Sequence, residues 1–158
     1  MNIASNIPPV LKTVHLDCSP TEAFRAFTED FSQWWPYATH SLGRADNVAH
    51  VVFEGGSGGR LYEVWKDGSK HLWGSITTWN PPGELAFSWH VGRDPALATE
   101  VRVTIRPDDG GSLMELSHSK WEILGDEAAG MRARYDAGWT EVFERCFGGF
   151  ARRRTGSP

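Results

Sequence analysis

Two polar residues, Glu63 and His118, fall at positions where apolar side chains are expected. Each lies in a stretch whose alternation of residue types predicts a β-strand with one face toward a core. Glu63 shares its predicted face with Leu61 and Trp65. His118 shares its face with Leu116. A buried carboxylate and a buried imidazole can act together as general acid and base, or hold one polar atom of an apolar ligand.

Each of these residues also has a structural interpretation. A core histidine is most often hydrogen-bonded to its neighbours and has no further role. For Glu63 the structural interpretation is an ion pair with an inward arginine, or a strand register that returns the side chain to solvent. No nucleophile–base pattern, metal-ligand spacing or cofactor fingerprint accompanies the two residues, so we expect no metal and no cofactor. Cys18 and Cys146 lie outside any CxxC pattern and are expected to be reduced thiols.

The elements that would position these residues follow from periodicity and turn residues. Apolar and alternating runs predict strands at Val10–Asp17, Val48–Glu54, Arg60–Lys66, Lys70–Trp79, Glu84–Val91, Thr99–Arg106 and Ser112–Trp121. Ser19 as N-cap and Pro20 at the first helical position predict a helix to about Thr28. A second short helix is predicted around Phe31 to Trp35. Consecutive strands joined by turns indicate an antiparallel sheet, and the fold class is α+β.

A long C-terminal helix is predicted from Asp126 to about Phe150, because apolar residues recur there with the spacing of one helix face. The apolar positions are Met131, Tyr135, Trp139, Val142, Phe143, Cys146 and Phe147. This helix must lie across the sheet, since neither element can bury its apolar face alone. We expect Trp139 to pack into the sheet and Gly138 to allow close approach of the helix backbone. A small molecule could bind between helix and sheet.

The Asp67–Gly68 turn sets the register of one hairpin. With these two as the turn residues, Glu63 pairs with Leu72 and Tyr62 with Trp73. The more apolar face is predicted to lie against the helix, and it carries Leu61, Glu63, Trp65, Leu72, Gly74 and Ile76. Trp73 is predicted on the opposite face.

Several motifs, spread in order along nearly the whole chain, carry a family resemblance. They are Ser19-Pro20-Thr21-Glu22, Phe24, Phe27, Phe31, Trp34-Trp35, Gly58-Gly59-Arg60-Leu61-Tyr62-Glu63, Asp67-Gly68, Trp73-Gly74, Trp79-Asn80-Pro81-Pro82, Trp89, His118 and Gly138-Trp139. With these residues the chain resembles the helix-grip fold of the START/Bet v 1 superfamily. More narrowly, it is similar to the SRPBCC group labelled as activators of the heat-shock-protein-90 ATPase.

The resemblance implies a curved antiparallel sheet wrapped around the long C-terminal helix, with two short helices after the first strand. It implies one SRPBCC-type domain over residues 1–158, with an ordered core of about 9–153. Relatives in the superfamily include lipid and hormone carriers, polyketide cyclases and aromatases, so the fold alone does not name a function.

Three functions are therefore compared. The favoured one is a non-enzymatic carrier or sensor of a small apolar or aromatic ligand. The second is a polyketide cyclase- or aromatase-like enzyme that uses Glu63 and His118. The third is a module that binds a chaperone or another protein. The residues expected to contact a ligand are Trp35, Glu63, Trp65, Trp89, Leu116, His118, Tyr135, Trp139 and Phe143.

Composition limits the partners. The net charge of −4 gives no electrostatic reason for nucleic acid binding. No apolar run approaches the roughly 20 residues that span a bilayer. The N-terminal residues lack the features of a signal peptide, so a cytoplasmic location is expected. The eight tryptophans suit a pocket with large flat walls. Whether the chain forms a homodimer is left open.

Overall fold

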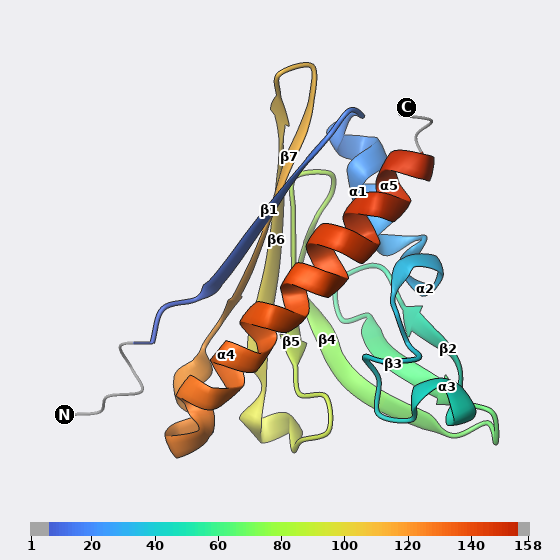
Figure 1. Cartoon of the computed structure of the whole chain (residues 1–158), viewed down its shortest axis with the longest axis vertical. Coiled ribbons are helices and arrows are strands. Elements are labelled where there is room, and N and C mark those ends of the chain that lie inside the picture. Colours follow the sequence, from blue (N-terminus) through green and yellow to red (C-terminus); the bar gives the residue numbers. More distant parts are fainter. Residues whose placement is uncertain (1–6, 155–158) are drawn as a thin grey trace.

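A curved antiparallel sheet and a long helix across one of its faces make up the fold (Figure 1). The computed structural model describes residues 7–154. The strands are β1 (Val10–Leu16), β2 (Val48–Phe53), β3 (Arg60–Trp65), β4 (Lys70–Asn80), β5 (Glu84–Trp89), β6 (Thr99–Asp108) and β7 (Gly111–Ser119). Their order in the sheet is β1-β7-β6-β5-β4-β3-β2, so the first strand pairs with the last. This arrangement confirms the predicted α+β helix-grip fold.

The first two helices begin where the sequence predicts. The Ser19 hydroxyl accepts a hydrogen bond from the Glu22 N–H at 3.2 Å, with Pro20 at the first helical position. The N-terminal helices are α1 (Pro20–Thr28), α2 (Phe31–Trp34) and α3 (Arg44–Asn47). The short α3, a 3-10 turn at Pro95–Leu97 and a 3-10 segment at Trp121–Glu127 were not predicted. Within residues 7–154, no helix is long and apolar enough to cross a membrane.

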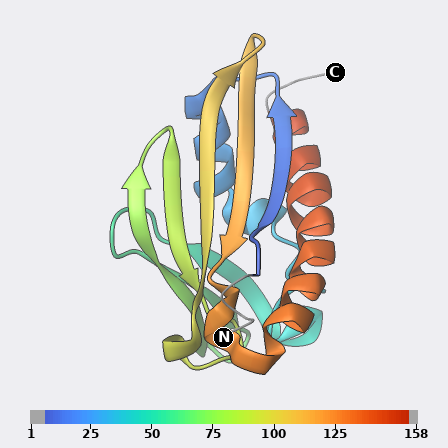
Figure 2. The same ribbon diagram turned by 90° about the vertical axis from the view of Figure 1, so that its left-hand side faces the viewer.

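The C-terminal helix is continuous from Ala128 to Arg154 and crosses the sheet diagonally (Figure 1). It consists of α4 (Ala128–Trp139), a π-helical segment (Thr140–Phe147) and α5 (Gly148–Arg154). In a π-helix each backbone N–H bonds to the carbonyl five residues earlier, so the side chains are spaced around the helix axis differently than in an α-helix. Figure 2 shows the helix standing beside β1, on the same side of the sheet as α1. Aromatic side chains occupy the space between the helix and the sheet.

Trp35, just after α2, contacts aromatic rings from several elements of the core. Phe31 stacks on it with ring centroids 5.2 Å apart. Three tryptophans from other elements also contact it: Trp73 at 5.1 Å, Trp89 at 5.8 Å and Trp139 at 6.0 Å. These tryptophans come from β4, β5 and α4, so one side chain joins two strands and the long helix. All five rings are at most 6% exposed.

The turn between β3 and β4 differs from the prediction by one residue. The Trp65 N–H donates to the Ser69 carbonyl at 2.9 Å, so the turn holds residues 66–68. Gly68 takes a φ of 89°, a value that glycine adopts without strain. Glu63 therefore pairs with His71, and the predicted pairing with Leu72 is wrong.

A bulge in β4 then restores the inner face. Leu61 pairs with Gly74 and Tyr62 with Leu72, which leaves Trp73 as the extra residue. Trp73 is fully buried and Leu72 is 41% exposed, the reverse of the prediction. An extra residue in one strand of a pair changes which residues face inward. Glu63 keeps its predicted inward position because β3 itself stays regular at this point.

Trp139 should be a large contributor to stability. Its ring is 3% exposed and contacts Trp35 and Trp89. We expect Trp139→Ala to lower the free energy of unfolding by ~3–5 kcal/mol in urea titrations, because truncation leaves a cavity. Leu97→Ala, at a side chain that is 41% exposed, is the control and should change it by less than ~0.5 kcal/mol. A loss below ~1 kcal/mol for Trp139→Ala would mean that the indole is not a core side chain.

Candidate functional site

A pocket of about 180 Å³ lies between α4, the end of β5 and the loop after α2. We call it the helix pocket. Its walls are mainly aromatic and apolar, and its lining residues are Trp35, Thr39, His40, Ser41, Leu42, Trp89, Val91, Tyr135, Gly138, Trp139 and Val142. It therefore lies where the sequence predicts a ligand, between the C-terminal helix and the sheet.

The structure brings only part of the predicted residue set to this pocket. Trp35, Trp89, Tyr135 and Trp139 line it. The predicted residues that do not line it are Glu63, Trp65, Leu116, His118 and Phe143. Leu116 and Phe143 are fully buried core side chains, and the Phe143 ring contacts Phe27 of α1 with centroids 6.4 Å apart. Trp65 lies on the β3–β4 hairpin, where its ring stacks on His71 with centroids 4.0 Å apart.

The loop residues 39–42 were missed because they carry no periodic pattern that would place them. Gly138 also has a different role from the predicted one. A Cβ added at Gly138 would meet no heavy atom within 4 Å. The glycine therefore does not serve close packing; it leaves one wall of the pocket free of a side chain.

Tyr135 and Trp89 supply a polar group at the pocket. The Trp89 indole N–H donates to the Tyr135 hydroxyl oxygen at 3.1 Å. A tyrosine hydroxyl is both acceptor and donor, so its own hydrogen can be donated to a bound molecule. His40 and Thr39, from the loop, add further polar groups to the pocket lining.

His118 supports two walls of the pocket from behind. Its Nδ1 accepts a hydrogen bond from the Trp139 indole N–H at 3.0 Å. The hydrogen of the neutral ring must then be on Nε2, which lies 2.7 Å from the Thr99 hydroxyl. That hydroxyl donates to the Trp89 carbonyl at 3.1 Å. Both ring nitrogens are thus engaged in holding Trp139 and Trp89, as the structural interpretation of His118 expects.

The environment of His118 keeps its ring neutral. Burial, and to a smaller degree the positive charge of Arg93, lower the pKa of His118 from 6.5 to about 3. A neutral imidazole is also required by the hydrogen bond to Nδ1, since a protonated ring would present a second donor to the Trp139 N–H. The histidine is therefore built into the structure in one tautomer.

Glu63 is fully buried and its carboxylate accepts four hydrogen bonds. Oε1 accepts from the Gly43 N–H at 2.9 Å and the Trp65 indole at 2.7 Å. Oε2 accepts from the Leu42 N–H and the Trp73 indole, both at 2.9 Å. Four donors fill the acceptor positions of a carboxylate. The inward orientation is confirmed, and N–H groups take the place of the arginine that the structural interpretation supposed.

The contacts of Glu63 fix the loop that walls the helix pocket. Leu42 lines the pocket, and Gly43 follows it directly. A Cβ on Gly43 would lie 2.8 Å from the Trp65 indole, so only glycine fits between that ring and the carboxylate. The Trp35 indole N–H donates to the His40 carbonyl at 2.9 Å and holds the middle of the loop. Glu63 therefore acts as a positioning residue for the pocket.

The family model described as "Activator of Hsp90 ATPase homolog 1-like protein" matches residues 17–146. The chain belongs to this family. No curated protein matches it.

Solved structures give the same fold. The anthrahydroquino-gamma-pyrone synthase Txn09 is 33% identical, over 91% of this chain and 97% of its own, with a TM-score of 0.59. CalC, a self-sacrificing resistance protein from Micromonospora echinospora, is 24% identical, over 93% and 96%, with a TM-score of 0.65. An AHSA1-like protein from Aeromonas hydrophila is 18% identical, over 95% of each chain, with a TM-score of 0.63. The last two show the shared fold alone.

Glu63→Gln tests the anchoring of the loop. The amide NH2 would face an indole or backbone N–H, leaving at least one buried donor unpaired. We expect the fold to persist, the free energy of unfolding to fall by about 1–3 kcal/mol, and the Leu42 and Gly43 amides to exchange faster with solvent. Glu115→Gln, at an exposed glutamate of β7, is the matched control. Unchanged exchange at both loop amides would contradict the anchoring role.

The low pKa of His118 makes stability depend on pH. Between about 6.5 and about 3 the unfolded chain binds a proton at this residue and the folded chain does not, so stability falls as the pH is lowered. Going from about pH 7.5 to about pH 5, this group alone should cost about 2 kcal/mol. His118→Asn should remove that part of the decline in urea titrations. A His118 ring that titrates by NMR with a midpoint near its usual value would disprove the argument.

Proposed function

We propose that the chain binds a small planar molecule, apolar or aromatic, in the helix pocket. The observation that carries the proposal is a set of aromatic walls, from Trp35, Trp89, Trp139 and Tyr135, around a space that Gly138 leaves open. Small-molecule sites typically combine apolar and aromatic walls with a few polar groups.

The volume limits the size of the ligand. An apolar cavity of roughly 150 Å³ is known to bind benzene. The helix pocket, at about 180 Å³, has room for a molecule of similar or slightly larger size. The Tyr135 hydroxyl and Nε2 of His40 would bind a carbonyl or hydroxyl group on it, since the Thr39 hydroxyl and Nδ1 of His40 are bonded to each other at 2.8 Å. Three indole walls favour a flat ring system, because offset and edge-to-face ring contacts are favourable.

A second candidate is an enzyme of the cyclase kind. The observation that favours it is the relative Txn09, which is named an anthrahydroquino-gamma-pyrone synthase. The residues first expected to carry acid–base chemistry, Glu63 and His118, have their polar side-chain atoms engaged and do not line the pocket. In this alternative, Tyr135 and His40 are the pocket groups able to move a proton. The chaperone-binding alternative stays a prediction, because no contact of the described residues tests it.

Filling the helix pocket should abolish ligand binding without harming the fold. Gly138→Leu projects a side chain into open space and raises helix propensity. We expect chromone, a flat two-ring molecule, to bind the wild type and to bind Gly138→Leu at least about tenfold more weakly in calorimetry. Gly130→Leu is the matched control, since Gly130 is exposed on the same helix and also has open space at Cβ.

Two results would contradict the proposal. One is equal affinity of chromone for the wild type and Gly138→Leu. The other is no binding and no change in tryptophan fluorescence with chromone, indole and naphthalene, three flat molecules that differ in polarity. Formation of a new product from a bound ring precursor, lost in Tyr135→Phe, would favour the enzyme over the carrier.

A further inference from the structure

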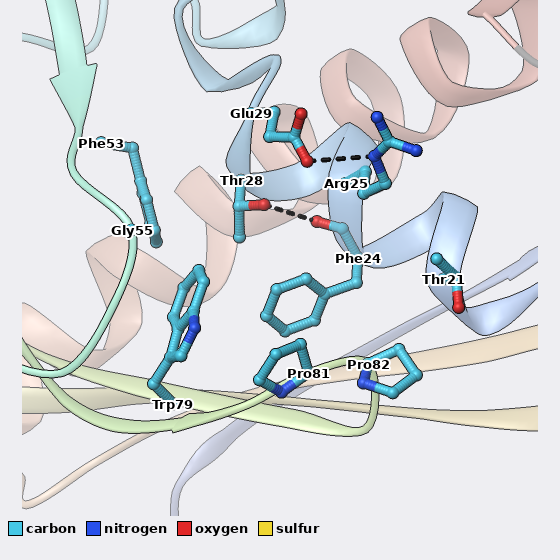
Figure 3. Close-up of a pocket in the computed structure, with 10 residues that line it drawn as sticks. All are labelled: Thr21, Phe24, Arg25, Thr28, Glu29, Phe53, Gly55, Trp79, Pro81 and Pro82. Carbon is cyan, nitrogen blue, oxygen red and sulfur yellow. Dashed lines mark hydrogen bonds and ion pairs between the residues drawn. The ribbon is translucent and has the colours of Figure 1, made fainter.

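A second and larger pocket, of about 470 Å³, lies between α1, the chain after β2 and the β4–β5 turn (Figure 3). We call it the α1 pocket. It shares no lining residue with the helix pocket. Its volume falls within the roughly 300–1,000 Å³ typical of small-molecule sites.

Filled aromatic core separates the two pockets. Phe53, which lines the α1 pocket, contacts Phe27 at 6.2 Å and Phe31 at 5.1 Å between ring centroids. Phe31 in turn stacks on Trp35, which lines the helix pocket. Phe27 and Phe31 are at most 2% exposed. The α1 pocket is therefore a separate space and not the far end of the same cavity.

The apolar walls of the α1 pocket are preformed. Phe24 and Trp79 meet edge to face, with ring centroids 5.0 Å apart and planes at 73°. Pro81 and Pro82 form the side opposite α1 in Figure 3. A Cβ on Gly55 would lie 3.2 Å from the Trp79 ring, so the glycine lets the indole lie against the chain. Rings and prolines have few torsions to order, which keeps the entropic cost of binding low.

Trp79 also has an unused donor. The other tryptophans of the chain each donate an indole hydrogen bond to a protein acceptor: Trp34, Trp35, Trp65, Trp73, Trp89, Trp121 and Trp139. Within residues 7–154, no acceptor meets the Trp79 N–H. A ligand oxygen can supply one, since half-buried indoles commonly find a partner.

The polar side of the α1 pocket carries no net charge. Arg25 and Glu29 of α1, which line the pocket, form an ion pair with Nε and Oε2 3.0 Å apart; in Figure 3 the pair lies across from the prolines, beyond Phe24. The Thr28 hydroxyl is occupied, because it donates to the Phe24 carbonyl at 2.8 Å. A compensated pair offers hydrogen bonds without attracting an ion of either sign, so the pocket suits an uncharged molecule.

We propose that the α1 pocket is a second binding site, for an uncharged ring-containing molecule that carries a hydroxyl, amine or carbonyl group. The rings lie against Phe24, Trp79 and the two prolines. The polar group meets the Trp79 N–H or the Arg25–Glu29 pair. This site accepts a larger molecule than the helix pocket does. It rests on its own geometry and does not depend on the function proposed above.

The test uses N-phenyl-1-naphthylamine, an uncharged probe whose fluorescence rises in apolar surroundings. The protein is Gly138→Leu, in which the helix pocket is filled, so binding there reports on the α1 pocket. We expect saturable binding and amide NMR shifts at Thr21 and Gly55. Adding Thr21→Trp, an exposed position that lines the pocket, should weaken binding about tenfold or more. Thr13→Trp, at an exposed threonine of β1, is the matched control.

Three results would overturn the proposal: no saturable binding to Gly138→Leu, shifts that avoid Thr21 and Gly55, or equal affinity after Thr21→Trp. Probe-dependent self-association in light scattering, with shifts confined to the outer surface, would also overturn it in favour of a protein-docking surface. If Thr21→Trp fails to fold by circular dichroism, the NMR shifts in Gly138→Leu decide the question. Loss of chromone binding at the helix pocket leaves this test unaffected.

Discussion

The buried carboxylate of Glu63 is the constraint on which the arrangement of the helix pocket depends. Moving a carboxylate out of water is costly unless hydrogen bonds replace its hydration. Here the replacement comes from Leu42 and Gly43 in the loop, Trp65 on β3 and Trp73 on β4. The loop and both strands must therefore meet at this side chain. The bulge in β4 is part of the same requirement, because it turns the Trp73 indole inward.

The side-chain positions fixed by Glu63 in turn fix the neighbouring rings of the aromatic core. Trp73 contacts Trp35 and Trp89, and those two rings meet Trp139 on the long helix. At the far side, His118 receives the Trp139 N–H. Aromatic packing alone tolerates several arrangements, whereas an indole N–H bound to a fixed acceptor selects one orientation of its ring. Two buried polar residues thus set the geometry of a largely apolar interior.

The sequence predicts the elements well because their signals are local. Periodicity places the strands and the long helix, and the Ser19 cap places the start of α1. The inward face of Glu63 follows from the period of two within β3. The strand register of its hairpin does not follow from that period. The turn of residues 66–68 and the bulge at Trp73 each add one residue, and the alternation of residue types does not reveal such insertions.

The pocket was harder to predict than the fold, and for a different reason. Four wall residues, Trp35, Trp89, Tyr135 and Trp139, were identified because large rings on an inward face border any space there. Leu116 and Phe143 lie on equally inward faces but are packed on all sides. Periodicity gives the direction of a side chain and not the depth of packing around it. The loop is placed by its hydrogen bonds to Glu63, which join residues about twenty positions apart in the chain, and no local pattern encodes such contacts.

The two functions proposed for the helix pocket require the same physical property, which is confinement of the bound molecule. Holding a flexible precursor in one folded shape can itself accelerate an intramolecular ring closure, since the entropic cost is met on binding. Rigid indole walls, kept in place by Glu63 and His118, supply that kind of confinement without an acid–base pair. A carrier and a cyclase built on this pocket would then share the same walls and differ in what reaches Tyr135 and His40. The distinction rests on the reactivity of the bound molecule more than on the fold that binds it.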